Sequence, residues 1–166
     1  MKAKLKPSIC YIAGLSKKDS EKNAVAVETG SEEIELRFVE AAIKEFKIEP
    51  TKVVIEEKKD GRRKVYFYHS RIARQLAEIR SREEKLFRVP NEFSCNYLAG
   101  MFDSTGGFSK TGVHLNILTP QDEVMLANLG IHTRNGRISN ISTFVALIGR
   151  YSYLLKSMNM TKRALS

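Results

Sequence analysis

A run of cations beside a predicted turn is the group of residues whose types and spacing most clearly suggest chemistry. Asp60-Gly61 is a strong β-hairpin signal, and five cations flank it: Lys58, Lys59, Arg62, Arg63 and Lys64. Cations at the tip of a hairpin are suited to contact the phosphates of a nucleic acid. The alternative is a solvated turn that binds nothing.

The charge of the whole chain favours the first interpretation. The 166 residues include 28 Lys and Arg against 19 Asp and Glu, which gives a net charge of +9 and a pI near 9.6. This balance is typical of proteins that bind polyanions. A basic protein without such a partner, acting as a structural or interaction module, remains the alternative.

Length and hydropathy limit the architecture to one compact domain or two half-size repeats with a shared core. No apolar run approaches the ~20 residues that a membrane span needs. Cys10 and Cys95 lie outside any paired Cys or His spacing, so neither a disulfide framework nor a zinc site is indicated. We therefore expect no membrane partner and a reducing, cytoplasmic location.

A short block recurs half a chain apart: YIAGL occupies 11–15 and YLAGM occupies 97–101, an offset of 86 residues. After each block the patterns predict a strand, an amphipathic helix, a hairpin and a second helix. The first half places them at 24–28, 31–46, 52–69 and 70–79, with Ser70 as a helix cap, and the second at 113–118, 119–130, 131–140 and 144–158. A charged connector, 80–91, joins the halves. Val113 follows Ala24 by 89 residues, so the first half has lost three residues and its first hairpin should be truncated.

The second block continues as LAGMFDSTGG over 98–107, which resembles the signature of the LAGLIDADG homing endonucleases. The first copy, IAGLSKKDS over 12–20, is more degenerate, and KLFRVP over 85–90 resembles the family's lead-in to the second repeat. The resemblance implies an α+β fold in which a pseudo-two-fold pair of αββαββα-type repeats packs on two motif helices, with saddle-shaped antiparallel sheets. It also implies repeats at 1–84 and 85–166.

Small residues in the two blocks have a physical role that does not depend on the resemblance. Ala13, Gly14, Ala99 and Gly100 remove side-chain bulk from one face of each predicted helix. Two such helices can approach closely and form a seam between the halves. Tyr11 and Tyr97 should pack beside this seam.

The resemblance also implies a pair of acidic residues, one at the end of each motif copy, that hold divalent metal beside the scissile phosphates. The alignment places Asp19 there in the first copy but Thr105 in the second. Asp103 stands two residues earlier, where a helix turns its side chain by about 200° away from the site. Asp19 is thus the expected metal ligand and, with Asp103 as a weak substitute, the expected catalytic pair, with Mg²⁺ as cofactor if the protein cleaves.

The family's hairpins lie in the major groove of DNA and use alternate side chains to reach bases and phosphates. His114 and Asn116 alternate on a predicted strand and could reach base edges, although such residues often form only a solvent face. The alternation in VYFY over 65–68 leaves open which aromatics are exposed. The full set of expected contacts is Lys17, Lys18, Lys58, Lys59, Arg62, Arg63, Lys64, Lys110, His114, Asn116, Arg134 and Arg137.

The sequence therefore predicts a monomer that binds double-stranded DNA, with cleavage lost or impaired because Thr105 replaces the second acid. One alternative is an active homing endonuclease in which Asp19 and Asp103 share the metals. Another is an RNA-splicing or regulatory protein that binds nucleic acid, with RNA in place of DNA.

Overall fold

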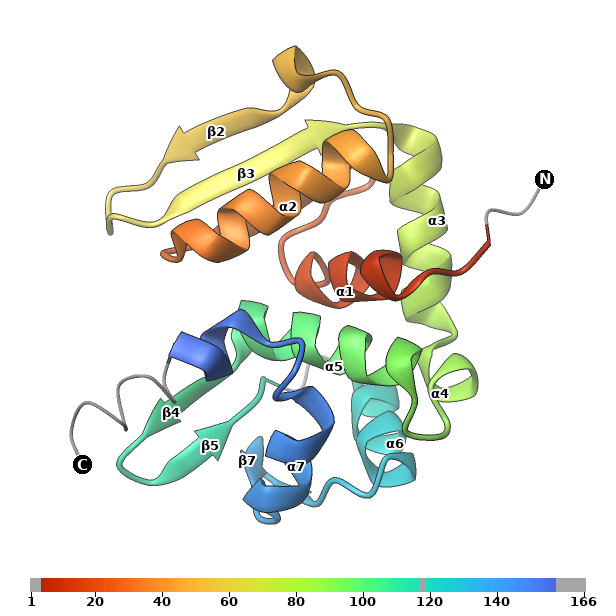
Figure 1. The fold of residues 1–166 in the computed structure, drawn as a ribbon, viewed down its shortest axis with the longest axis vertical. Helices are drawn as coiled ribbons and strands as arrows, with labels where there is room; N and C mark the ends of the chain where they lie inside the picture. Colours follow the sequence, from red (N-terminus) through yellow and green to blue (C-terminus); the bar gives the residue numbers. More distant parts are fainter. Residues whose placement is uncertain (1–3, 117–118, 158–166) are drawn as a thin grey trace.

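A computed structural model of the chain describes residues 4–116 and 119–157. Two halves, each with its own antiparallel sheet, lie on either side of two central helices, α1 and α5 (Figure 1). The fold is α+β, as the sequence predicts. The central helices are α1 (Pro7–Leu15) and α5 (Glu92–Thr105).

The two central helices touch at a pair of glycines. A Cβ built on Gly14 would lie 2.2 Å from the carbonyl oxygen of Tyr97, and one on Gly100 would lie 2.1 Å from that of Tyr11. Each glycine thus faces the backbone of the tyrosine in the other block. The two contacts are equivalent, because Gly100 and Tyr97 each follow Gly14 and Tyr11 by 86 residues. No residue with a Cβ fits such a separation, so the close approach depends on glycine at both positions. We call this contact the seam.

The first half contains a three-stranded sheet, sheet A, with strand order β1-β3-β2. One side is covered by α2, where Phe38 packs on Phe67 of the central strand with ring centroids 5.8 Å apart. Its elements are β1 (Ala24–Thr29), α2 (Glu32–Lys44), the 3₁₀ turn η1 (Pro50–Lys52), β2 (Val54–Glu57), β3 (Arg63–Tyr68) and α3 (Ser70–Ser81). The predicted cap Ser70 is wrong: His69 is the N-cap of α3, because its Nδ1 accepts the N–H of Ile72 at 3.3 Å.

The second half contains a four-stranded sheet, sheet B, with strand order β4-β5-β7-β6. Its elements are β4 (Gly107–Ser109), β5 (Gly112–His114), α6 (Pro120–Asn128), β6 (Thr133–Arg134), β7 (Arg137–Ile138) and α7 (Ile141–Ile148). β5 corresponds to β1, and the described part of the first half has only an isolated bridge, Glu21 to Ala24, where β4 would stand. The predicted truncation of the first hairpin is therefore confirmed. The predicted strand 113–118 is shorter than expected, with residues 117–118 outside the described part.

The last predicted helix, 144–158, is broken in the structure. α7 ends at Ile148, and helical backbone resumes only at Tyr153 and runs to Ser157; residue 158 lies outside the described part. The break has a cause in α5, because the carboxylate of Asp103 accepts the N–H groups of Tyr153 at 2.9 Å and Leu154 at 3.1 Å. A side chain from another element therefore starts this second helical segment.

The connector between the halves is also more ordered than its charge suggests. It contains the short helix α4 (Glu83–Leu86), so the predicted repeat boundary at residues 84 and 85 falls inside a helix.

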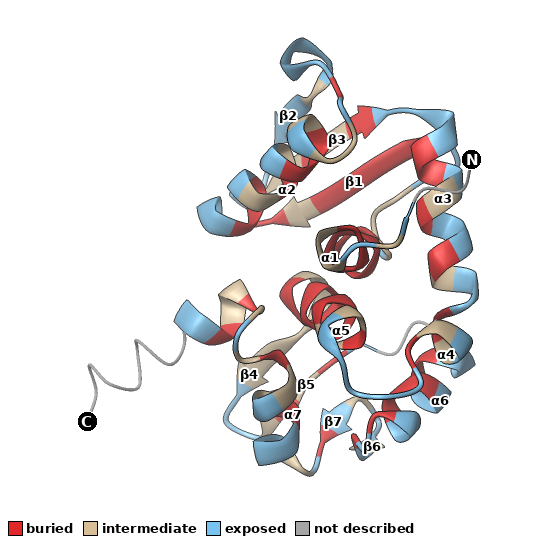
Figure 2. Ribbon diagram, turned by 45° about the vertical axis from the view of Figure 1, so that its right-hand side comes forward, coloured by how far each residue is buried: buried red, intermediate tan, exposed pale blue. Residues whose placement is uncertain are grey.

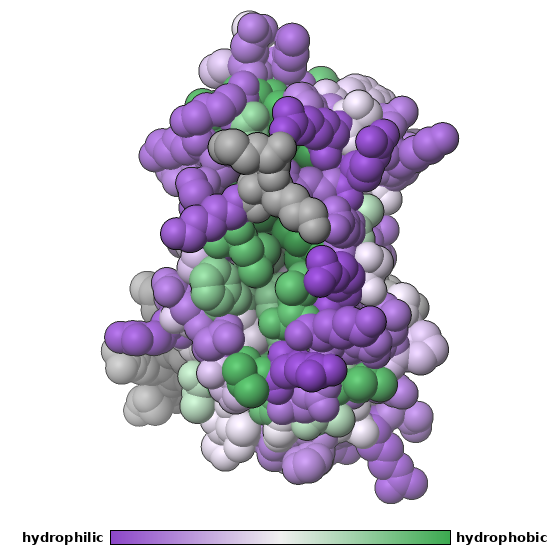
Figure 3. Space-filling view, turned by 90° about the vertical axis from the view of Figure 1, so that its right-hand side faces the viewer, coloured by the Kyte–Doolittle hydropathy of each residue, from purple (hydrophilic) through white to green (hydrophobic). Residues whose placement is uncertain are grey.

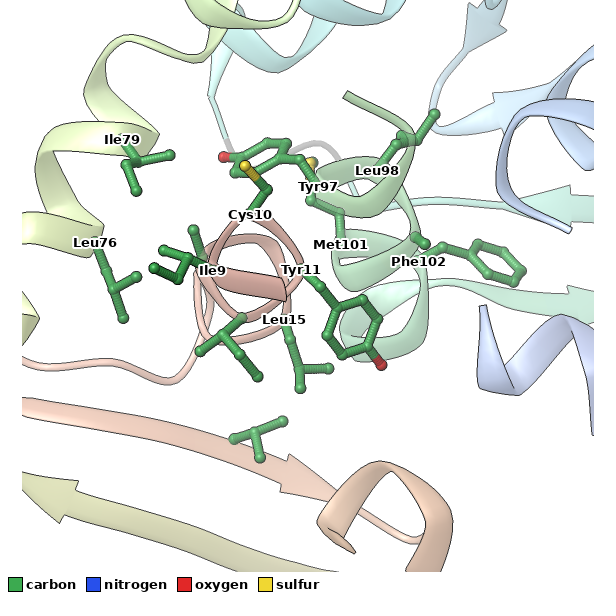
Figure 4. Close-up of a cluster of buried hydrophobic side chains, with 14 of the residues drawn as sticks. Ile9, Cys10, Tyr11, Leu15, Leu76, Ile79, Tyr97, Leu98, Met101 and Phe102 are labelled. Carbon is green, nitrogen blue, oxygen red and sulfur yellow. The ribbon is translucent and has the colours of Figure 1, made fainter. Parts of the chain in front are cut away.

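Buried residues form one continuous cluster around α1 and α5 (Figures 2 and 4). Hydrophilic side chains dominate the face that carries α3 and α4, with an apolar strip between the halves (Figure 3). In the described residues, no helix combines the length and apolar character of a membrane span.

Candidate nucleic-acid interface

The two motif copies end differently. α1 stops at Leu15, so Asp19 lies in the turn that follows, half-buried, with Oδ2 accepting the N–H of Glu28 at 3.0 Å. α5 continues to Thr105, whose Oγ1 donates to the carbonyl of Met101 one turn earlier, at 3.0 Å. The two ends thus offer one carboxylate and one hydroxyl that donates to its own helix.

Asp103 is fully engaged inside the protein. Its carboxylate accepts four hydrogen bonds: from Tyr11 Oη at 2.6 Å, Ser152 Oγ at 2.5 Å, and the backbone N–H groups of Tyr153 and Leu154. Burial raises the pKa of Asp103, although these four donors oppose that shift. The structure thus places Asp103 in the core at the start of the last helical segment, away from solvent.

Lys17 occupies the position in the first repeat that Asp103 occupies in the second. Its Nζ contacts Glu83 Oε2 at 2.9 Å and pairs with Asp122, and both carboxylates are buried. Tyr97, the counterpart of Tyr11, donates to Glu83. The structure therefore holds Lys17, an expected DNA contact, in a buried cluster that joins the first repeat, α4 and α6. We call Lys17, Glu83 and Asp122 the buried ionic cluster.

Burial changes the acidity of this cluster. The pKa of Glu83 rises to about 7, chiefly because burial disfavours its charged form and also through its contact with Asp122, while Tyr97 and Lys17 oppose the shift. Arg80 adds a further cation nearby, donating to the carbonyl of Ala13 at 3.2 Å. Sequence reasoning missed Glu83 and Asp122. The sequence carries no local signal for them, because Lys17, Glu83 and Asp122 lie far apart along the chain.

These donors do not fit a metal centre of two carboxylates. In the described residues, no three His, Cys, Asp or Glu side chains come together as a group that could hold a metal ion. Asp19 supplies a single carboxylate, and the hydroxyl of Thr105 carries no charge to draw a hard cation from water. The side chain of Asp103 is occupied elsewhere.

The outer face of sheet A, away from α2, carries mixed charge. Val65 and Phe67 point into the core, so Lys64, Tyr66 and Tyr68 point outward. The residues paired with them share this face: Glu28 and Glu56 with Lys64, Ala26 and Val54 with Tyr66, and Ala24 with Tyr68. Two carboxylates therefore flank the one lysine of this face.

The basic hairpin between β2 and β3 is partly neutralised by neighbouring acids. Lys58 Nζ lies 3.6 Å from Glu28, and Arg62 donates to the carbonyl of Glu28 at 2.9 Å. Arg63 points to the helix side, where it pairs with Glu35 at 3.2 Å. Lys59 is exposed at the tip, as is Lys18 in the turn after α1.

The outer face of sheet B is basic. Val113 and Ile138 are buried, so the opposite side presents His114, Arg137 and Arg134, which neighbour one another across β5, β7 and β6. A hollow of about 310 Å³ beside them is lined by His114, Leu115, Asn116, Glu123, Asn135 and Gly136. Lys110 is exposed in the turn between β4 and β5. The structure thus brings three expected contacts of the second repeat, His114, Arg134 and Arg137, together on one face, with Asn116 in the lining of the hollow beside them.

This architecture, two repeats of helix and antiparallel sheet joined through a glycine seam, is the fold of the LAGLIDADG homing endonucleases. Solved structures of the homing endonuclease I-DmoI share it. A variant in complex with its target DNA and Mn has a TM-score of 0.61 and 20% identity, with 90% of this chain and 96% of that chain covered.

Two further I-DmoI structures agree. The complex with DNA and Mn has a TM-score of 0.61 and 19% identity, covering 86% of this chain and 96% of that one. A structure of mesophilic variants has a TM-score of 0.60 and 17% identity, covering 86% and 94%. No protein-family model and no curated protein matches the sequence. At this identity the likeness is one of fold.

Proposed function

We propose that this chain binds double-stranded DNA as a monomer and that its capacity to cleave DNA is lost or strongly impaired. The observation that carries the proposal is Thr105, which stands where the second carboxylate of the motif pair would be and donates to its own helix. I-DmoI, which shares the fold, has been solved with DNA and Mn. Both repeats lie in one chain, so the seam is complete without a second copy.

Loss of cleavage follows from the charge at the helix ends. Metal-assisted hydrolysis of a phosphodiester needs carboxylates that place cations beside the attacking and departing oxygens. Asp19 is one such group, and Asp103 is not available as the other, because breaking its four hydrogen bonds would leave buried donors unpaired. An active enzyme that uses Asp103 would have to unfold the start of its last helical segment.

Retention of binding follows from sheet B. Arg134 and Arg137 stand side by side on an outer face whose paired residues in the described strands include no carboxylate. Guanidinium groups suit phosphate oxygens and the O6 and N7 atoms of guanine. The basic face and the net charge of +9 together support an electrostatic contribution to duplex binding.

A salt titration of duplex binding tests this proposal. Fluorescence anisotropy should show that the logarithm of the affinity falls steeply with the logarithm of salt concentration. In Arg134→Ala/Arg137→Ala the slope should become shallower by about 1 for each phosphate that the variant no longer binds. Lys44→Ala/Lys52→Ala removes the same charge from α2 and η1 and should leave the slope close to that of the wild type. Affinity that is absent, or that does not respond to salt, would contradict duplex binding.

A further inference from the structure

The turn between β6 and β7 consists of Asn135 and Gly136. Arg134 pairs with Arg137 across it, so only these two residues form the turn. Their φ angles of 51° and 77° are the left-handed backbone that a two-residue hairpin turn requires. Asparagine is a thermally labile residue, and its side chain is most open to the next backbone nitrogen when glycine follows, because glycine has no Cβ in the way.

Two features of the fold require glycine at position 136. Its φ of 77° is uncommon for a residue with a side chain. In addition, a Cβ built on Gly136 would lie 2.7 Å from the carbonyl oxygen of Leu115, whose N–H donates to the carbonyl of Gly136 at 2.8 Å. The contact between this turn and the chain after β5 therefore fixes the residue that follows Asn135 as glycine.

The groups of this pair that can react with each other are accessible. Asn135 is exposed and lines the hollow beside His114, which admits water. In the described part of the chain, no hydrogen bond holds the side chain of Asn135 or the N–H of Gly136. By contrast, the side chains of Asn91 and Asn140 each accept a backbone N–H at 2.9 Å.

The turn between β2 and β3 provides an internal comparison. It also contains an acidic or amide residue before glycine, Asp60-Gly61, but the N–H of Gly61 donates to the carbonyl of Lys58 at 3.1 Å. The carboxylate of Asp60 accepts the N–H of Arg62 at 3.0 Å. The two groups that would have to react are thus occupied in this turn, whereas in the β6–β7 turn they are not.

We propose that Asn135 is a site of spontaneous deamidation. The backbone nitrogen of Gly136 bonds to Cγ of Asn135, and the side-chain amide leaves as ammonia together with the proton from that nitrogen. The product is a succinimide ring in the backbone. Water then opens the ring at one of its two carbonyl groups and leaves aspartate or isoaspartate at position 135. Water is the only co-reactant that these steps need.

The two products differ in their effect on the hairpin. Asp-Gly also suits a two-residue turn, so aspartate keeps the hairpin and adds a carboxylate between Arg134 and Arg137. Isoaspartate adds a methylene to the backbone, which does not fit such a turn and should separate β6 from β7. Either product lowers the positive charge of the outer face of sheet B. Its effect on duplex binding rests on the proposed function.

Mass spectrometry of the native protein tests the modification without any ligand. During incubation at mildly alkaline pH, the wild type should gain the mass difference between a hydroxyl and an amino group, and fragmentation should localise it to position 135. Asn135→Gly keeps a turn that tolerates positive φ at both positions. This matched control should gain mass much more slowly, through its other asparagines. Isoaspartate, detected by enzymatic methylation, should form at position 135 and not at Asp60.

Two results would overturn the proposal. One is a native protein that keeps Asn135 unmodified while a peptide covering residues 131–140 deamidates, because the fold would then protect the site. The other is a gain of mass by Asn135→Gly as fast as that of the wild type.

Duplex affinity tests the consequence separately. Asn135→Asp has the composition of one product and should bind a duplex more weakly than Asn135→Gly, with a salt slope shallower by up to about 1, the value for one phosphate contact. Equal affinities of these two variants would overturn the effect on binding. If no form of the protein binds a duplex, the proposed function fails, and the mass measurements still decide the modification.

Discussion

The strands β1-β3-β2 of sheet A follow the same order as β5-β7-β6 of sheet B, yet the outer faces of the two sheets differ. In sheet A two carboxylates flank one lysine beside two tyrosines, whereas in sheet B two arginines and a histidine neighbour one another. Their inner sides are alike, because both contribute apolar side chains to the same buried cluster. The two repeats thus match in their apolar inner sides and differ on the faces that could meet a ligand.

The flanks of the seam differ in the same way. Tyr11 and Tyr97 hold equivalent positions and each donates its hydroxyl to a carboxylate. On one flank that carboxylate is Asp103 of the motif itself, and on the other it is Glu83 from the connector, with Lys17 at the position of Asp103. The lysine at this position is neutralised by acids from two other elements, Glu83 of α4 and Asp122 of α6.

Substitutions of the seam glycines should have the largest effect on stability. They test whether the two repeats make equivalent contacts at the seam. Gly14→Ala and Gly100→Ala each place a Cβ about 2 Å from a backbone carbonyl, which cannot move without shifting a helix. Each should lower the free energy of unfolding by about 3 kcal/mol, measured by urea denaturation. Gly30→Ala, with no atom within 4 Å of the added carbon, is the matched control and should change it by less than about 0.5 kcal/mol. If either Gly14→Ala or Gly100→Ala left the free energy of unfolding unchanged, the close contact of α1 and α5 would not depend on glycine at both equivalent positions.

Substitutions of Lys17 and Asp103, on the two flanks of the seam, should have the next largest effects on stability. Lys17→Met leaves Glu83 and Asp122 buried together without their cation and should cost about 3 kcal/mol in urea denaturation. Asp103→Asn keeps the shape but turns an amide toward one of four donors, and should cost about 2 kcal/mol. If Lys17→Met were harmless, the buried ionic cluster would not hold the halves together.

The pH dependence of stability should distinguish the ionic flank. The pKa of Glu83 is about 7 when folded, against 4.5 without the fold, so the folded state binds its proton more tightly. Its contribution to stability is therefore present at low pH and declines as pH rises from about 4.5 to about 7. Unfolding free energies on either side of this window, compared with Glu83→Gln, should show that the wild type loses more stability on going to the higher pH. An equal pH dependence in the two proteins would mean that Glu83 ionises normally.

Single charges on the sheets should have the smallest effects. Arg137→Ala should weaken duplex binding several-fold, about 1 kcal/mol, whereas Lys64→Ala on sheet A should change it by less than about twofold. Both side chains lie on outer faces, so stability should change by no more than about 0.5 kcal/mol. Equal reductions of duplex affinity would show that both sheets meet the duplex alike.

Features set by short-range pattern could be predicted from the sequence. The offset of 86 residues identified the repeated blocks and the difference of three residues identified the truncated hairpin, since both depend only on order along the chain. The hairpin predicted over 131–140 is also present, and its turn residues Asn135 and Gly136 have positive φ angles of 51° and 77°.

Features that depend on residues far apart in the chain could not be predicted from the sequence. The break after Ile148 depends on Asp103, which lies on another helix. Glu83 reads as part of a charged connector, because its partners Lys17 and Asp122 are far away in sequence. Which tyrosines of β3 face solvent became clear only once the packing of α2 on Phe67 was known.

We propose that this LAGLIDADG fold binds DNA without cleaving it. Its most direct test incubates the protein with a plasmid carrying a duplex that the protein itself has selected from a random pool, in Mg²⁺ or Mn²⁺. We expect neither nicked nor linear product from the wild type at concentrations that saturate binding, because Thr105 supplies no second carboxylate. Cleavage by the wild type that disappears in Asp19→Asn would contradict the account.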